Sequence, residues 1–283
     1  MSVLLAGCDF SSSPGPRKPI VMAMGHLQRG RVHLDALEAL PTLRGYADWL
    51  TVDRAWVCGF DFPFGLPREL VEHLGWPLQW QACMRHYASL SRADIRQAFA
   101  AFCDARPVGG KFAHRATDGP AGSSPSMKWV NPPVAFMTHA GVPPLIESGV
   151  HLPGLHAPED RPPQVARVAL EAYPALLARE LLGPNGARRS YKSDDVAKQS
   201  ADRLIARKDM LTALESGQTR LGLRVRLSHA QRDALVDDAR GDRLDALLCL
   251  VQTAWAQLQH EQGHPRYGLP ADMDPLEGWI VSA

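Results

Sequence analysis

Short apolar runs that end in turn-forming residues dominate the first part of the chain. Residues 2–10 (SVLLAGCDF) and 55–61 (AWVCGFD) are almost entirely apolar, and each ends near an acid, before a segment rich in turn-forming residues. Residues 20–27 and 31–34 are separated by Gln-Arg-Gly, which predicts a β-hairpin. A later run, 167–173, has the same character. These patterns predict buried strands, because such strands are short and end where turn residues begin.

Apolar residues at spacings of three and four predict helices in much of the remaining chain. The segment 35–52 carries this pattern, with Pro41 near its start, and predicts a helix. Further helices are predicted over 68–73, 92–102, 134–147, 174–182, 194–216 and 228–238. A last helix begins near Asp242, and its apolar stripe is formed by Leu244, Leu247, Leu248, Val251 and Trp255. Residues 278–281 predict a closing edge strand.

The order of these elements predicts an α/β protein with a mixed sheet flanked by helices. We expect a single domain over 1–283, with a helical and loop segment at about 68–160 inserted after the fourth strand. Within that insertion, residues 104–133 are rich in glycine and proline and predict a long irregular loop. Such a loop in a compact domain is usually functional or disordered.

Composition narrows the function classes. The 31 basic and 30 acidic residues leave a net charge of +1, which excludes a strongly basic coat for nucleic acid but not a local basic face. The five cysteines form no C-x-x-C pair and no zinc spacing, as expected for reduced thiols in a cytosolic protein. Neither a signal peptide nor a membrane span is recognisable. The sequence therefore predicts a soluble cytoplasmic protein without membrane partners.

Acids recur at the ends of the predicted strands. Asp9, Asp61 and Glu171 each fall there, and carboxyl ends of parallel strands meet at one sheet edge. Asp242 and Asp245 are three residues apart, so both can project from one side of the last helix. The alternatives are that acids end strands where the chain leaves the core, and that Asp242 caps its helix. An all-oxygen set without histidine or cysteine suits Mg²⁺ or Mn²⁺.

Four motifs in order carry a resemblance to a known family: Gly7-Cys8-Asp9, the run 59–67 (GFDFPFGLP), Glu171-Ala172-Tyr173-Pro174 and the run 242–247 (DRLDAL). The chain resembles domain-of-unknown-function family 429, predicted nucleases of the ribonuclease H-like (RNase H-like) superfamily. The resemblance implies a three-stranded antiparallel meander continued by two parallel strands and flanked by helices.

A wider similarity is to the Holliday-junction resolvases of that superfamily, of the RuvC type. It implies metal-binding roles for Asp9, Asp61, Asp242 and Asp245. Two positions depart from the resolvase pattern. Asp61 stands where resolvases usually carry glutamate, and Glu171 has no counterpart. Glu171 is therefore open to three roles: a metal ligand, a base that assists the ligands, or a structural anchor.

Basic side chains supply candidate substrate contacts. Lys111, His114, Arg115 and Lys128 lie in the predicted loop beside Trp129, and such mixtures can hold phosphates and stack a base. A second cluster contains Arg188, Arg189, Tyr191 and Lys192, and Lys192 could reach a scissile phosphate. The alternative for both clusters is ordinary solvated charge. Lys111, Arg115, Lys128 and Lys192 are the predicted substrate-binding residues.

The leading hypothesis is a metal-dependent nuclease that hydrolyses DNA or RNA. Two Mg²⁺ or Mn²⁺ ions about 4 Å apart can activate water and stabilise the leaving oxygen. Asp9, Asp61, Asp242 and Asp245 would hold them, with Glu171 assisting. A catalytically silent RNase H-like module for nucleic-acid binding or assembly is the first alternative. An actin-like or sugar-kinase-like nucleotide-binding protein is the second, and it requires a duplicated set of strands that this chain lacks.

Overall fold

The computed structural model describes residues 3–157, 166–183 and 189–283. The end of the predicted insertion (158–160) and Arg188 lie outside the described residues. The strands are β1 (Leu4–Asp9), β2 (Ile20–Gln28), β3 (Arg31–Leu40), β4 (Trp56–Phe60), β5 (Arg167–Glu171) and β6 (Arg224–Arg226). The helices before β5 are α1 (Leu43–Leu50), α2 (Arg68–His73), α3 (Trp80–Ser89), α4 (Arg92–Asp104), α5 (Asp118–Ala121) and α6 (Val134–Glu147). Those after it are α7 (Pro174–Leu181), the 3-10 turn η2 (Val196–Lys198), α8 (Ala201–Ser216), α9 (His229–Asp237) and α10 (Asp242–Glu261).

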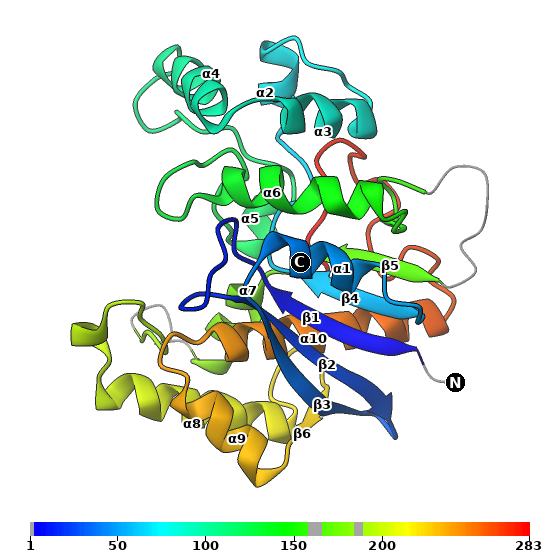
Figure 1. The fold of residues 1–283 in the computed structure, drawn as a ribbon, viewed down its shortest axis with the longest axis vertical. Helices are drawn as coiled ribbons and strands as arrows, with labels where there is room; N and C mark the ends of the chain where they lie inside the picture. The colour runs from blue at the N-terminus through cyan, green and yellow to red at the C-terminus, as the bar shows by residue number, and fades with distance from the viewer. Residues whose placement is uncertain (1–2, 158–165, 184–188) are drawn as a thin grey trace.

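A six-stranded mixed sheet forms the centre of the molecule, in the order β5-β4-β1-β2-β3-β6 (Figure 1). Strands β1, β2 and β3 form an antiparallel meander. Strand β4 runs parallel to β1, and β5 runs parallel to β4. The predicted α/β class, with a meander followed by two parallel strands, is therefore confirmed. The short β6, parallel to β3 at the far edge, has no counterpart among the predicted elements.

The alternation of side chains along β1 assigns its residues to two hydrophobic cores. Leu4, Ala6 and Cys8 enter the core that contains residues of α1, α2, α3, α4 and α6. Leu5, on the opposite face, joins the core that contains residues of α7, α8, α9 and α10. Because side chains alternate with a period of two, Gly7 and Asp9 belong to the face of Leu5. Asp9 thus lies on the side of α10.

Helix α10 packs directly against β1 because the strand presents a glycine to it. A Cβ atom added at Gly7 would lie 2.1 Å from the backbone nitrogen of Leu250 and 2.2 Å from the carbonyl oxygen of Ala246. The hydroxyl of Thr253 also donates a hydrogen bond of 2.8 Å to the carbonyl oxygen of Ala6. These contacts hold α10 against the strand that ends in Asp9, and so determine where the start of α10 lies.

The prediction of a helix over 35–52 is wrong in its first part. Strand β3 extends through Leu40, with Leu40 opposite Ile20 on β2, and α1 begins only at Leu43. Leu37, Leu40 and Leu43 have helical spacing, but pairing with β2 determines the conformation of the first two. The new helix starts where the Thr42 hydroxyl accepts a hydrogen bond of 3.0 Å from the Gly45 amide.

The segment after β4 contains the predicted helices and two that were not predicted, α3 and α5. Helix α6 has the predicted bounds, and α2 and α4 lie where the periodicity placed them. The aromatic-rich stretch between α2 and α4 contains α3, and the predicted irregular loop contains the short α5. Residues 278–281 contribute a single parallel bridge between Ile280 and Glu171 instead of a strand. Within the described ranges, no helix combines the length and apolarity needed to cross a membrane.

A candidate acidic site at the carboxyl edge of the sheet

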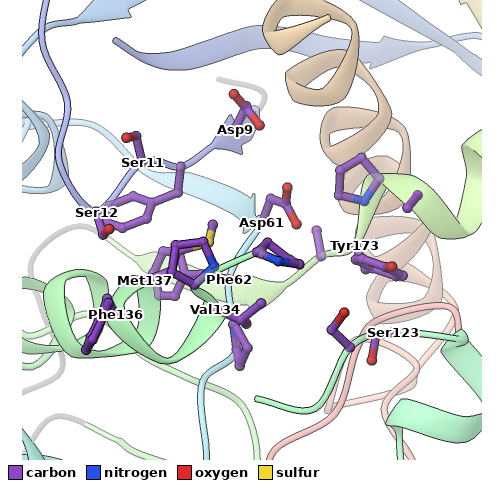
Figure 2. A pocket seen from close by; sticks show the side chains of 18 of the residues that line it. Asp9, Ser11, Ser12, Asp61, Phe62, Ser123, Val134, Phe136, Met137 and Tyr173 are labelled. Carbon is purple, nitrogen blue, oxygen red and sulfur yellow. The ribbon is translucent and has the colours of Figure 1, made fainter. Parts of the chain in front are cut away.

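Asp9 and Asp61 lie side by side at the ends of adjacent parallel strands. Cys8 is opposite Phe60 in the β1–β4 register, and the Asp61 amide donates a hydrogen bond of 2.9 Å to the Cys8 carbonyl oxygen. In β4, Trp56, Cys58 and Phe60 enter the core beside α1, so Asp61 belongs to the opposite face, that of α10. Both carboxylates line one cleft (Figure 2). The predicted convergence of these two acids is present.

The beginning of α10 places two more acids above this strand edge. The helix starts at Asp242, directly after Gly241, whose φ of 78° suits glycine. The side chain of Asp238 accepts a hydrogen bond of 2.8 Å from the Arg243 amide. Asp238 therefore satisfies a free amide at the helix start, and Asp242 makes no side-chain capping bond. The capping alternative for Asp242 does not describe this structure.

Asp245 is fully buried and is held by two neighbours from the segment before η2. The Tyr191 hydroxyl donates a hydrogen bond to its Oδ1, and the Lys192 ammonium contacts Oδ2. Lys192 remains 43% exposed, whereas the Asp245 side chain is 0% exposed. Gly241 makes room for this arrangement, because an added Cβ there would lie 2.8 Å from the Lys192 Cβ. Lys192 thus connects a buried acid with the open cleft.

The acids outnumber the cations that face them, and their pKa values reflect this. Burial, with repulsion from Asp245, raises the pKa of Asp61 to about 7. Burial and the charges of Asp245 and Asp61 raise the pKa of Asp9 well above its usual value. Burial, with repulsion from Asp238, also raises the pKa of Asp242. Burial lowers the pKa of Lys192, but the neighbouring Asp245, Tyr191 and Asp9 together raise that pKa overall. The site has an excess of negative charge that an added cation would relieve.

The acids open into a cleft of about 580 Å³, which Asp9, Asp61 and Asp242 line together with Lys18 and Lys192. Apolar side chains from the start of α6 and the segments beside it also line the cleft, namely Phe10, Phe62, Pro132, Pro133, Val134, Phe136 and Met137. Figure 2 shows Val134, Phe136 and Met137 at the end of the cleft away from Asp9. In Figure 2, Asp61 lies between Asp9 and Val134.

Glu171 lines the same cleft together with Arg115, but its charge is balanced within a cluster of its own. It is opposite Phe60 in the β4–β5 register, and Phe60 faces the α1 side, so Glu171 belongs to the face opposite Asp9 and Asp61. The Arg115 guanidinium donates to both of its oxygens at 2.7 and 2.8 Å, and the Phe64 amide donates at 2.9 Å. Burial raises the pKa of Glu171, and Arg115 opposes that rise. Of the three roles left open for Glu171, these contacts favour the structural anchor.

Arg115 is a partner of Glu171 and not an exposed cation as expected. Its side chain is 1% exposed, and its remaining contacts are with Asp118 and the Glu277 carbonyl oxygen. Five hydrogen bonds thus engage its five N–H donors. Because no donor is left for a phosphate, the expected substrate contact is not available to Arg115 in this structure.

The remaining predicted substrate residues fall in different places. Lys192 lines the cleft, whereas Lys111 and Lys128 are not among its lining residues. Lys111 is exposed and lies 3.8 Å from Asp104. Two lining cations were not predicted, Lys18 and Arg92. Lys18 sits in the turn-rich segment after the first strand, and that position was the only signal available in the sequence.

The donor set suits a hard divalent cation, but its present arrangement is open. Among the residues that the structure describes, no group of three or more His, Cys, Asp or Glu side chains is arranged to hold a metal ion. Asp9 and Asp61 accept no hydrogen bond from any described residue, so nothing of that kind fixes their carboxylates. The side chains of Asp9 and Asp61 would therefore have to rotate to bind a cation, and no hydrogen bond from a described residue opposes that rotation.

Comparison with known proteins adds no relative: no family model, curated protein or solved structure matches the chain.

Proposed function

We propose that this protein is a Mg²⁺- or Mn²⁺-dependent phosphodiesterase of the RNase H-like type that acts on DNA or RNA. The observation that supports the proposal most strongly is the convergence of Asp9, Asp61 and Asp242 on one cleft, with too few cations to balance them. The order of the strands, and the resemblance of the ordered motifs to domain-of-unknown-function family 429, support the same proposal.

The side chains divide into three roles in this proposal. Asp9, Asp61 and Asp242 provide carboxylate oxygens, which are the preferred ligands of Mg²⁺ and Mn²⁺. Asp245 joins them only if Lys192 moves away from it, because its oxygens are engaged by Tyr191 and Lys192. When bound, divalent ions lower the pKa of water and stabilise a leaving oxygen. Lys192, held by Asp245, presents a positive charge to a phosphate at the same end of the cleft.

The test is hydrolysis of short single-stranded and duplex DNA and RNA, with Mn²⁺ or with a chelator. We expect wild-type cleavage that needs Mn²⁺ and that falls by more than about 100-fold in Asp9→Asn and Asp61→Asn, since even partners behind metal ligands can cost 10–100-fold. Asp48→Asn is the matched control, because Asp48 is an exposed acid paired with Arg44. Absence of wild-type cleavage with either metal, or equal cleavage by wild type and Asp9→Asn, would overturn the proposal.

A catalytically silent nucleic-acid-binding module is the second candidate. One observation favours it: among the residues that the structure describes, the acids are not arranged to hold a metal ion. The two candidates separate in the same experiment, because a silent module would retain oligonucleotide without cleaving it, and Asp9→Asn would leave that binding unchanged.

A further inference from the structure

We propose that the cleft takes a nucleotide-sized phosphate ester with a planar base, and not an internal segment of a long duplex. The inference deepens the proposed function and rests on it for the position of the phosphate, which would lie beside Asp9, Asp61 and Lys192. What it adds is the group at the other end of the cleft and the size of the whole substrate.

The end of the cleft away from the acids is an accessible apolar wall. Pro132 and Pro133 are exposed, Val134 and Met137 are partly buried, and all four line the cleft. No charged residue stands among 132–137. The flat face of a nucleobase can pack against such a surface, and this contact tolerates any base because each has a π-face.

Ring packing and a hydrogen bond hold this apolar wall in place. The Phe62 ring, which lines the cleft, packs against Phe10 with 4.6 Å between centroids. The Thr138 hydroxyl of α6 donates a hydrogen bond of 2.9 Å to the Pro63 carbonyl oxygen, which joins α6 to the segment that follows Asp61. The acids and the apolar wall are thus fixed relative to each other through a few residues after β4. A site of this kind can select a ligand by the separation of its phosphate and its base.

Polar groups also border the apolar end. The Arg92 guanidinium lies 5.1 Å from the centroid of the Phe136 ring and donates a hydrogen bond of 2.8 Å to the Ser12 carbonyl oxygen. Ser123 and Tyr173 stand on the other side of the cleft in Figure 2. An apolar pocket with a few polar groups at its margin is typical of small-molecule sites.

Size and charge argue against a long duplex. The volume of about 580 Å³ lies within the range of about 300–1,000 Å³ that small-ligand pockets occupy. Duplex binding relies on many phosphate contacts from an extended basic surface. Here the chain has a net charge of +1, Arg115 is buried among acids, and Lys111 and Lys128 do not line the cleft.

The experiment compares 5′-AMP with ribose 5-phosphate, which lacks the base, by calorimetric titration of the full chain with and without Mn²⁺. We expect AMP to bind about tenfold tighter or more, the effect of stacking one base. Val134→Asp should reduce the preference to about threefold or less, because a charge on the wall opposes stacking. Val130→Asp is the matched control, since Val130 is 50% exposed and does not line the cleft.

Melting temperatures verify folding, and Met137→Glu replaces Val134→Asp if that variant does not fold. Equal wild-type affinities for AMP and ribose 5-phosphate would overturn the inference, as would equal losses in Val134→Asp and Val130→Asp. Faster Mn²⁺-dependent cleavage inside a 20-base-pair duplex than of a dinucleotide would overturn it while leaving the proposed function intact. Base-selective binding of AMP by a protein that cleaves no diester would overturn the proposed function and support base recognition by the cleft.

Discussion

Two groups of acids at the same edge of the sheet differ in how their charge is balanced. Glu171 and Asp118 surround Arg115, whose five donors are all engaged, so this cluster is closed to further ligands. Asp9 and Asp61, on the opposite face of their strands, line the same open cleft but accept no hydrogen bond from a described residue. The first arrangement is that of a structural anchor, and the second leaves negative charge that the proposed cation would balance.

The difference arises from one position of strand register. Asp61 follows Phe60 on β4, and Glu171 is opposite Phe60 on β5. Because adjacent residues of a strand point to opposite faces, that offset sends Asp61 toward α10 and Glu171 toward the inserted helices. An acid at a strand end is therefore an incomplete signal, and its face decides which partners it meets.

We expect the largest change in the free energy of unfolding when Arg115 is removed from its cluster with Glu171 and Asp118. Arg115→Ala leaves Glu171 and Asp118 buried without their cation, so the free energy of unfolding should fall by about 3–5 kcal/mol. Urea denaturation measures the loss. Arg44→Ala, which removes an exposed ion pair with Asp48, should cost no more than about 1 kcal/mol. A loss in Arg115→Ala no larger than in that control would contradict the role assigned to Arg115.

A smaller loss is expected from Lys192→Met. The buried Asp245 carboxylate loses its cation but retains the hydrogen bond from Tyr191, so we expect a loss of about 1–3 kcal/mol. The control is Lys18→Met, which breaks an exposed pair with Asp194 and should change stability by about 0–1 kcal/mol. Equal stabilities of Lys192→Met and wild type would indicate that Asp245 does not depend on this lysine.

The smallest expected change in stability is a gain instead of a loss. It comes from Asp61→Asn and depends on pH. The Asp61 carboxyl has a pKa of about 7 in the folded protein, against 3.8 as its ordinary value. Between these values the unfolded chain releases a proton that the folded protein retains, so rising pH destabilises the fold through this group. Asn does not titrate, and Asp61→Asn should therefore be more stable than wild type by about 1–2 kcal/mol at pH 8, a gain that disappears near pH 4. Unfolding curves at the two pH values measure the gain, and a variant less stable at pH 8 would refute the raised pKa.

The local pattern of apolar residues was sufficient to predict most helices and strands of this fold. The bounds of α6 and the start of α10 followed from apolar spacing, and β1 and β4 followed from short apolar runs. It failed where long-range pairing decided the outcome: Leu37 and Leu40 have helical spacing but pair with β2. The three-residue β6 is too short to show a pattern.

The acids of the candidate site could be predicted from local pattern, but the long-range contacts among its side chains could not. The acids were found because they mark strand ends and a helix start. The contact of Tyr191 and Lys192 with Asp245 joins residues more than 50 positions apart, and no local spacing reports it. The pairing of Arg115 with Glu171 is likewise long-range, so a buried arginine in a glycine-rich segment could be mistaken for a substrate contact.

The contrast between the two clusters is tested most directly by the effect of Mn²⁺ on thermal unfolding of wild type, Asp9→Asn and Glu171→Gln. A ligand at 100 times its Kd stabilises a fold by about 2.7 kcal/mol. We expect Mn²⁺ to raise the Tm of wild type and of Glu171→Gln by similar amounts, whatever their starting values, and to leave Asp9→Asn unchanged. A wild-type Tm that does not respond to Mn²⁺, or an equal rise in Asp9→Asn, would contradict a cation site on the face of α10.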